Sequence, residues 1–389
     1  MVKIWNFHPQ RKLTMHPLHE QRYQLQLRST LLTLLAAAIT LWGLLAIYRT
    51  LALTGEWEQF LARQSLWALA AWTGFFLLLK VKFSKLMKYS LLFAGAGAAA
   101  LLLLPLAGVK INNMNGWYQF KSLTMQPSEI FKAFYILALI KVLNLPRLGE
   151  FARFAAALAI ILAFTVLLLI QPDLGTAAVY LAGGFGALYF SNVKFKYLLG
   201  TAALALAAAI SAVSANAYML NRLKFFFAPD LSPSGGGWHL RQFCIATARG
   251  EWFGVKGDMA VWSNSFLPLA HNDSIFAALC EMLGFCGAII LLLLYGGFFH
   301  QAFSLAMWRR NQLRCSVISA MSFMIFFQTA LHIAVNLNLV PATGLTLPLI
   351  SYGGSSLVGT MLMLAIIISA GRQDCATLLP ALKKTSDKL

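Results

Sequence analysis

Ten apolar runs of membrane-spanning length leave few folds open to this chain. A transmembrane helix needs about 20 mostly apolar residues, and a soluble domain carries about 25% charged residues. This sequence of 389 residues is 59% hydrophobic and only 11% charged. The runs lie near 29–48, 65–79, 90–109, 128–144, 151–170, 174–190, 197–215, 274–300, 316–338 and 354–371. We therefore expect an all-α polytopic membrane protein with about ten transmembrane helices, in one domain over 29–371.

The basic residues predict how these helices are oriented. The net charge of +18 could indicate a nucleic-acid partner, but most lysines and arginines fall on one side of the predicted membrane. Cationic residues beside short loops stay in the cytoplasm, so we expect cytoplasmic tails at 1–28 and 372–389. The basic side chains would then face anionic lipid headgroups, and we expect no nucleic-acid partner. The first 28 residues also lack the apolar core of a signal peptide.

One outer loop, about 216–273 between the seventh and eighth predicted helices, is much longer than the others. Long connections are usually either functional or disordered. Aromatic residues such as FFF at 225–227 favour an ordered segment that folds back over the outer membrane face. A shorter outer loop before Pro127 carries Trp117, Tyr118 and Phe120, which suit the membrane interface.

Asp273 ends the long loop and stands directly before the apolar run 274–300. A charge near hydrocarbon is costly and is usually kept for function. A carboxylate whose pKa is raised by partial burial suits a general base near neutral pH. Asp273 is therefore the candidate catalytic residue.

Glu129 and Lys132 lie in the first turns of the fourth predicted helix, which Pro127 begins. Two interpretations of Lys132 stay open. Its side chain either extends to the outer surface, or faces a cavity and binds an anion such as a lipid-linked pyrophosphate.

Asp173 and Glu281 have predicted structural roles. Asp173 follows Pro172 in a tight connection, where an aspartate often caps the next helix. Glu281 lies two turns below Asp273 inside an apolar run, and we expect it to pair with a cation such as Lys132 or to stay protonated.

The last outer segment, 336–356, contains two prolines and three glycines at membrane depth. Irregular backbone survives there only when it is buried in protein or lines a wet cavity, so we predict a broken or re-entrant element. Its polar side chains either line a cavity or only satisfy the broken backbone: Asn336, Thr343, Ser351, Tyr352, Ser355 and Ser356. The five cysteines show no metal-ligand spacing, and we predict neither a metal site nor a disulfide.

Four segments of this sequence together resemble the SEDS family, the RodA/FtsW/SpoVE proteins of bacterial cell-wall synthesis. They are QPSEIFK (126–132), QPDLGT (171–176), FLPLAHNDSIFAALCEMLGFCGA (266–288) and GLTLPLISYGGSS (344–356). The resemblance covers about residues 100–370, whereas the first hundred residues match mainly in hydropathy.

The resemblance implies an inverting peptidoglycan glycosyltransferase of the bacterial cytoplasmic membrane, acting in elongation or division. Such proteins polymerise lipid II, an undecaprenyl-pyrophosphate-linked disaccharide peptide, on the outer face. They usually act with a class B penicillin-binding protein and other elongasome or divisome membrane proteins. The essential aspartate of the family falls on Asp273, its loop tryptophan on Trp117 and its lysine on Lys132.

The departing pyrophosphate needs a cation beside it. Lys132 is the first candidate, with Lys121 or Arg222 behind it, and a divalent cation is a further option, although no cofactor is certain. His271, Ser351 and Ser355, which lie in the matching segments, are further substrate-binding candidates.

The sequence also departs from the family pattern. Leu269 stands where the family commonly has Glu, Gly116 precedes Trp117 in place of Arg, and Thr124 lies where Arg or a similar residue is common. These departures indicate a divergent member. A lipid-linked precursor flippase and a non-catalytic scaffold for a penicillin-binding protein remain the alternatives.

Overall fold

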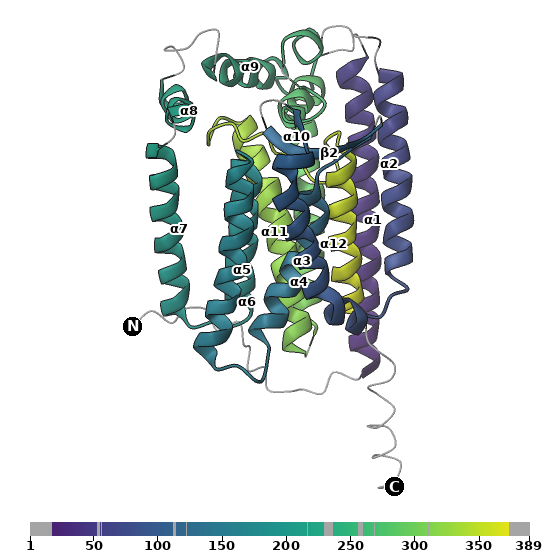
Figure 1. Cartoon of the computed structure of the whole chain (residues 1–389). Helices are drawn as coiled ribbons and strands as arrows, with labels where there is room; N and C mark the ends of the chain where they lie inside the picture. The colour runs from purple at the N-terminus through teal and green to yellow at the C-terminus, as the bar shows by residue number, and fades with distance from the viewer. Residues whose placement is uncertain are drawn as a thin grey trace, which may run out of the picture.

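The computed structural model describes residues 18–52, 55, 57–111, 114–121, 123–215, 217–228, 236–255, 260–267, 269–309 and 311–372. Its long helices run alongside one another, and two shorter helices lie across one end (Figure 1). The long helices are α1 (Leu18–Leu51), α2 (Trp57–Leu78), α3 (Phe83–Ala107), α4 (Pro127–Leu143), α5 (Glu150–Ile170), α6 (Leu174–Phe190), α7 (Phe195–Ala215), α10 (Ile275–Met307), α11 (Gln312–Asn336) and α12 (Gly354–Gly371). Each predicted apolar run falls on one of them, which confirms the all-α polytopic fold class.

Within the described residues, six helices are long and apolar enough to cross a membrane: α1, α3, α5, α10, α11 and α12. Two further apolar stretches, Leu174–Phe190 and Phe195–Ala207, are shorter. The full number of spans therefore stays a prediction.

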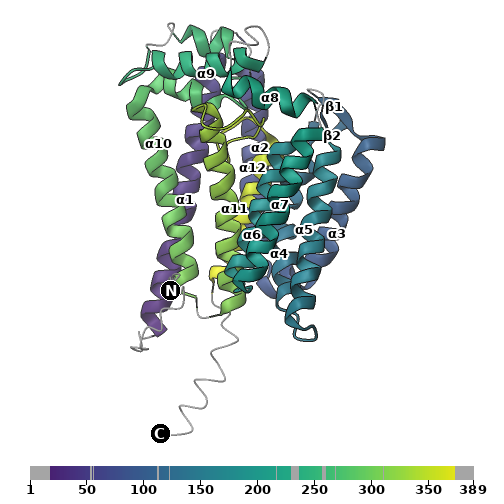
Figure 2. The same cartoon turned by 90° about the vertical axis from the view of Figure 1, so that its left-hand side faces the viewer.

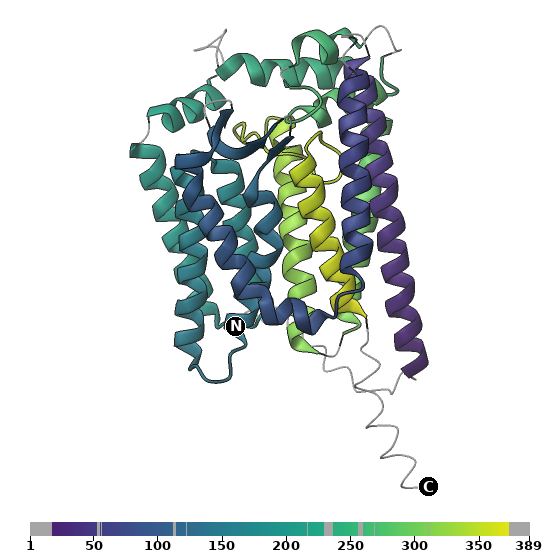
Figure 3. The same ribbon diagram turned by 45° about the vertical axis from the view of Figure 1, so that its right-hand side comes forward.

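The centre of the helix bundle is α12. Its apolar window is 83% buried, whereas the corresponding window of α3 is only 28% buried. Helices α2, α4 and α11 pack around α12. On one side, α1 packs along both α2 and α10, as Figures 2 and 3 show. Helices of similar hydropathy therefore differ in how deeply they are buried, because they have different numbers of neighbouring helices.

One end of the bundle carries the basic connections, and we call it the basic end. Gln21 at the start of α1 donates to the carbonyl oxygen of Trp308 at 2.8 Å. Arg309, just after α10, reaches the carbonyl oxygen of Gly371 at the end of α12. The described chain therefore begins and ends at the same end, as an even number of spans requires.

Helix α1 begins eleven residues before its apolar run, inside the segment expected to be a tail. The extension is stabilised by α10, because Arg28 hydrogen-bonds to Gln301 and lies over the ring of Trp308. The hydropathy pattern marked only the apolar part of this helix.

The opposite end is the one that the charge pattern predicts to face outward, and we call it the outer end. There the connection between α3 and α4 forms a small antiparallel sheet that the sequence did not predict. Its strands are β1 (Val109–Ile111), β2 (Met114–Phe120) and β3 (Leu123–Met125), in the order β1-β2-β3. The Tyr118 hydroxyl donates to the carbonyl oxygen of Ala100 at 2.7 Å and so ties β2 to α3.

The described parts of the long outer segment are mainly helical, as the ordered interpretation expects. They form α8 (Ala217–Phe227), α9 (Gly236–Arg249) and a short π-helical turn, η3 (Trp262–Phe266). Helices α8 and α9 lie over the ends of the long helices (Figure 2).

Helix α10 is interrupted at Gly284, whose φ of 65° and ψ of −168° are not helical. The freed backbone N–H groups of Phe285 and Cys286 donate to the carbonyl oxygens of Glu251 and Trp252, at 2.8 and 3.0 Å. Broken backbone inside a membrane helix must find such partners. The segment after α9 therefore supplies the acceptors that these two N–H groups need, and the same hydrogen bonds hold it against α10.

Candidate functional site

Asp273 lies at the outer end, in a turn of residues 269–274 that leads directly into α10. The turn is closed by a 2.8 Å hydrogen bond from the N–H of Asn272 to the carbonyl oxygen of Leu269. His271, Asn272 and Asp273 are all half-buried. The candidate carboxylate thus lies just before the start of a long apolar helix.

The main chain of this turn is held by the last residue of α11 and by the segment between α11 and α12. Three consecutive carbonyl oxygens, those of residues 271, 272 and 273, each accept a hydrogen bond from this region. The donors are the Tyr352 N–H (2.8 Å), the Ser351 hydroxyl (2.8 Å) and the Asn336 amide (3.0 Å). Asn336 also accepts from the N–H of Ala277 at 3.1 Å and so caps the first turn of α10.

The segment 337–353 contains no helix longer than a turn, and its apolar side chains from Leu345 to Ile350 are buried. This agrees with the predicted broken element. Gly344 is exposed, and a Cβ atom there would lie 3.6 Å from an Asp273 carboxylate oxygen. The carboxylate oxygen Oδ2 thus lies next to an exposed residue, whereas Oδ1 is buried.

His271 packs against aromatic rings. Its ring centroid lies 4.7 Å from that of Phe60 and 5.5 Å from that of Tyr352. Burial lowers the pKa of His271 from its ordinary value, since a charged imidazole is poorly solvated there. The ring is therefore mainly neutral at neutral pH.

Lys132 does not extend to the outer surface, so that interpretation is wrong. Its side chain is 2% exposed, and its Nζ atom lies 2.7 Å from Glu129 Oε2 and 3.0 Å from Gln328 Oε1. Gln328 in turn donates to the carbonyl oxygen of Thr346 at 3.2 Å. Lys132 faces inward, but the anion that it binds here is Glu129 of the same helix.

Glu281 pairs with a cation, as predicted, but the cation is Arg249 and not Lys132, so the choice of Lys132 is wrong. Glu281 is fully buried and accepts from Arg249 Nε at 3.0 Å and from the N–H groups of Trp262 and Ser263 at 3.3 and 2.6 Å. The Ser263 hydroxyl donates to it as well. Because α9 and η3 fold down onto α10, the cation comes from the outer segment.

Asp173 caps α6, as predicted, because it accepts from the N–H of Thr176 at 3.0 Å. It also accepts from the Gln126 amide at 3.1 Å. Burial raises its pKa to about 6, an effect that these hydrogen bonds oppose and Glu129 reinforces. Ser355 accepts from the N–H of Gln126 at 2.9 Å, and so it ties α12 to the start of α4.

The remaining predicted residues also lie in outer-end elements. Trp117 is half-buried on β2, opposite Val109. Lys121 is exposed in the turn after β2. Arg222 belongs to α8, but its side chain lies outside the described residues.

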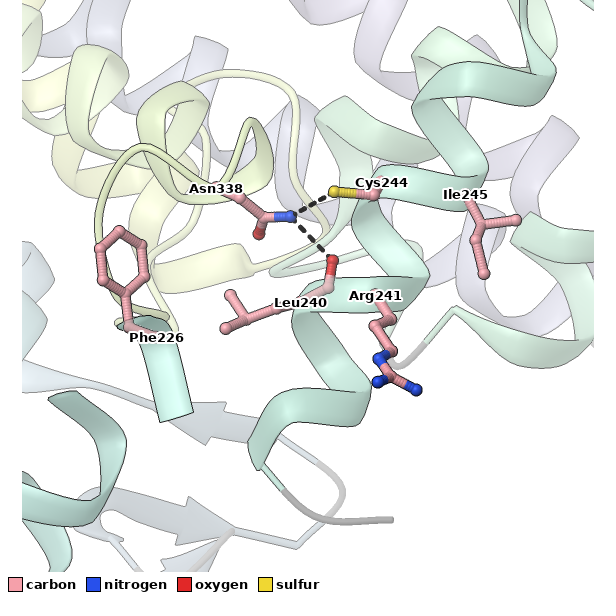
Figure 4. A pocket seen from close by; sticks show the side chains of 6 residues that line it. All are labelled: Phe226, Leu240, Arg241, Cys244, Ile245 and Asn338. Carbon is pink, nitrogen blue, oxygen red and sulfur yellow. Dashed lines mark hydrogen bonds between the residues drawn. The ribbon is translucent and has the colours of Figure 1, made fainter. Parts of the chain in front are cut away.

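A cavity of about 320 Å³ lies beside this region, between α8, α9 and the chain after α11 (Figure 4). Asn338 donates to the carbonyl oxygen of Leu240 and to the sulfur of Cys244, both at 2.8 Å. The lining residues include none of the predicted site residues: Phe226, Leu240, Arg241, Cys244, Ile245 and Asn338.

Sequence reasoning missed Gln328 and His332, two buried polar residues of α11. His332 Nδ1 hydrogen-bonds to the carbonyl oxygen of Leu345 at 2.7 Å. With Asn336 they follow a spacing of four residues, which places all three on one helix face. Three polar residues at this spacing inside an apolar run were the available signal.

Comparisons with known proteins agree with this architecture. Residues 28–375 match the model of the FtsW/RodA/SpoVE cell cycle protein family. A probable peptidoglycan glycosyltransferase FtsW of Thioalkalivibrio sulfidiphilus is 34% identical over 284 residues, 70% of either chain. The corresponding protein of Aromatoleum aromaticum is 30% identical over 86% of this chain and 85% of its own.

Solved structures give the same result. A chain of a peptidoglycan synthase complex in which polymerization and crosslinking are coordinated superposes with a TM-score of 0.74, at 31% identity, over 88% of this chain and 98% of its own. The rod shape determining protein RodA of Thermus thermophilus gives a TM-score of 0.66 at 28% identity, over 88% and 97%.

Proposed function

This chain belongs to the FtsW/RodA/SpoVE family, and from that membership we propose that it is a peptidoglycan glycosyltransferase that polymerises lipid II. The relatives that match it along most of their length carry the name of this activity. The reaction takes place at the outer end of the bundle, where Asp273 lies.

One observation carries the proposal. The main chain at Asp273 is fixed by three consecutive carbonyl hydrogen bonds, while the carboxylate borders exposed Gly344. A general base needs a defined position and access to the substrate. This turn supplies both at a membrane surface.

In the proposed reaction, Asp273 removes the proton from the acceptor sugar hydroxyl. The hydroxyl oxygen forms a bond to the anomeric carbon of the donor sugar, and the bond from that carbon to the pyrophosphate breaks with inversion. One base is sufficient, because no covalent enzyme intermediate forms. The lipid tails lie in the membrane beside the apolar helices.

The cation that stabilises the departing pyrophosphate is not Lys132, because Glu129 and Gln328 occupy its ammonium group. Lys121 is exposed at the outer end, and we propose it, with Arg222, for this role. Trp117 and His271 are proposed as substrate contacts.

We propose a class B penicillin-binding protein as the partner. The similarity to a synthase complex that coordinates polymerization and crosslinking supports this. Clustering of basic connections at the end opposite Asp273 supports a bacterial cytoplasmic membrane location with both termini in the cytoplasm.

A test is glycan-strand synthesis from purified lipid II, with and without the co-purified partner. Asp273→Ala should abolish the polymer. Glu150→Ala removes an exposed carboxylate that pairs with Lys194 at the basic end and should leave polymer formation unchanged. Normal strands from Asp273→Ala would refute the assignment.

A flippase for a charged pyrophosphate lipid is expected to have charged side chains through the whole membrane depth. Among the described residues, the buried charged side chains are Glu129, Lys132, Asp173 and Glu281. All four lie in the first two turns of their helices from the outer end, or in a connection there. The described part of the bundle thus supports surface chemistry over transport, and lipid II flipping by the protein in liposomes would reverse this preference.

A further inference from the structure

The first two helices contact the segment that holds Asp273, although their sequence resembles the family mainly in hydropathy. Gln64 on α2 is 2% exposed. Its amide nitrogen donates to the carbonyl oxygen of Ser351 at 3.3 Å, and its amide oxygen accepts from the N–H of Gly353 at 3.2 Å. One side chain therefore bonds the backbone on both sides of Tyr352.

The same short segment is fitted closely against α1 and α2. At Gly43 on α1, a Cβ atom would lie 2.7 Å from the Cα atom of Ile350. At Gly354, a Cβ atom would lie 2.3 Å from the ring of Trp67 on α2. Such distances leave no room for a side chain, so the segment has little freedom to move toward either helix.

The residues fixed in this way are the ones that hold the turn. The Tyr352 N–H and the Ser351 hydroxyl bind the carbonyl oxygens of His271 and Asn272. Phe60, one helical turn before Gln64, packs its ring on both His271 and Tyr352, at 4.7 and 5.0 Å. A continuous set of contacts thus runs from α2 to the residues next to Asp273.

We propose that Gln64 is a positioning residue for Asp273. Non-helical backbone buried in a membrane protein must satisfy its polar groups from neighbouring elements, and Gln64 does so at the two residues flanking Tyr352. Without it, Ser351 and Tyr352 lose their fixed position, and the turn moves with them. A shift of about 1 Å in a reacting group costs roughly 100-fold in rate.

The inference rests on the proposed function, since it assigns Asp273 as the group to be positioned. It predicts that Gln64 affects the rate of the chemical step more than substrate binding. A residue that only stabilised the fold would instead lower the amount of active protein.

The main variant is Gln64→Leu, which keeps the volume and removes both hydrogen bonds. We expect kcat for lipid II polymerisation to fall by roughly 10- to 100-fold, with KM unchanged within about twofold. The matched control is Gln21→Leu. Gln21 is also a buried glutamine, on α1, and its amide bonds a carbonyl oxygen at the basic end. This control should keep the wild-type kcat.

A second variant, Gln64→Glu, gives an independent result. When protonated, its carboxyl group has the same donor and acceptor as the amide, whereas the ionised form places a negative oxygen against the carbonyl oxygen of Ser351. Activity relative to wild type should therefore be retained at lower pH and fall as pH rises. A ratio far below one at low pH, where the carboxyl group is protonated, would contradict the positioning role.

Hydrogen exchange separates this inference from the proposed function. Gln64→Leu should speed exchange in peptides covering 266–276 and 349–356, whereas Gln21→Leu should not. If the wild type makes no polymer, the proposed function fails, and exchange alone decides the positioning. If the wild type is active and Asp273→Ala is not, wild-type kcat and exchange in Gln64→Leu would overturn the role of Gln64.

Discussion

Two carboxylates stand eight residues apart on and just before α10, and their surroundings differ. Glu281 is fully buried and accepts hydrogen bonds from Arg249, Trp262 and Ser263. Asp273 is half-buried beside exposed Gly344, and the hydrogen bonds that fix it go to its main chain and to that of its neighbours.

This contrast distinguishes a structural carboxylate from a candidate catalytic one. A carboxylate surrounded by charged and neutral donors stabilises the parts it joins, because its acceptor positions are filled. Asp273 is instead positioned through its backbone, and its carboxylate lies beside an exposed residue, Gly344. Four predictions test this comparison, in order of decreasing effect.

The largest effect is expected from Asp273→Asn. The amide has the shape of the carboxylate but cannot act as a base, so polymerisation of lipid II should fall on the order of 10³- to 10⁴-fold. The melting temperature should stay within about 2 °C of the wild type. A large loss of stability with retained activity would show that Asp273 is a structural carboxylate and not the general base.

Glu281→Ala should act through stability, lowering the free energy of unfolding by about 4 kcal/mol. The loss comes mainly from the buried donors of Ser263 and Trp262, because Arg249 is 39% exposed and can reach water. Denaturation of the purified protein in detergent measures it. Activity per folded molecule should stay within about tenfold of wild type, and the exposed carboxylate change Glu150→Ala should cost under about 1 kcal/mol.

Lys132→Met should cost about 3 kcal/mol, because Glu129 is left buried without its cation. The double variant Glu129→Gln with Lys132→Met removes both charges and should be more stable than Lys132→Met alone. Thermal denaturation of all four proteins completes the mutant cycle. Additive effects would show that the two side chains do not form the buried pair.

The smallest effect concerns Asp173 and pH. Its pKa of about 6 is above the ordinary value, so the folded protein holds this proton more tightly than the unfolded chain. Its contribution is complete below about pH 4 and is lost as pH rises through about 6. Between about pH 5 and 8 the wild type should lose about 1 kcal/mol relative to Asp173→Asn. An unchanged difference between the two proteins across this range would contradict the raised pKa.

Local rules predicted several features correctly. Pro127 begins α4, and Asp173 caps α6, because each depends on the residue type at a helix start. The pairing of Glu129 with Lys132 also had a local signal, since residues three apart share a helix face. The interpretations of Lys132 as a surface residue or a ligand for a lipid-linked anion did not include this nearer carboxylate.

The strands between α3 and α4 show the opposite case. Short segments with Trp117 and Tyr118 have an interfacial composition that suits a loop or a strand equally well. Only the antiparallel pairing of β2 with β1 and β3 distinguishes them, and pairing is not a property of one segment.

The sequence alone determined the membrane fold class, the clustering of charge at one end and the position of Asp273 just before a long apolar helix, because hydropathy and helix starts are local. Only the tertiary structure decided that Arg249 pairs with Glu281, and that Asn336, Ser351 and Tyr352 hold the turn of Asp273. These partners are 32 to 81 residues apart in the chain. In a bundle of uniformly apolar helices, such partners are selected by which helices pack together and at what depth, and an apolar pattern does not encode that choice.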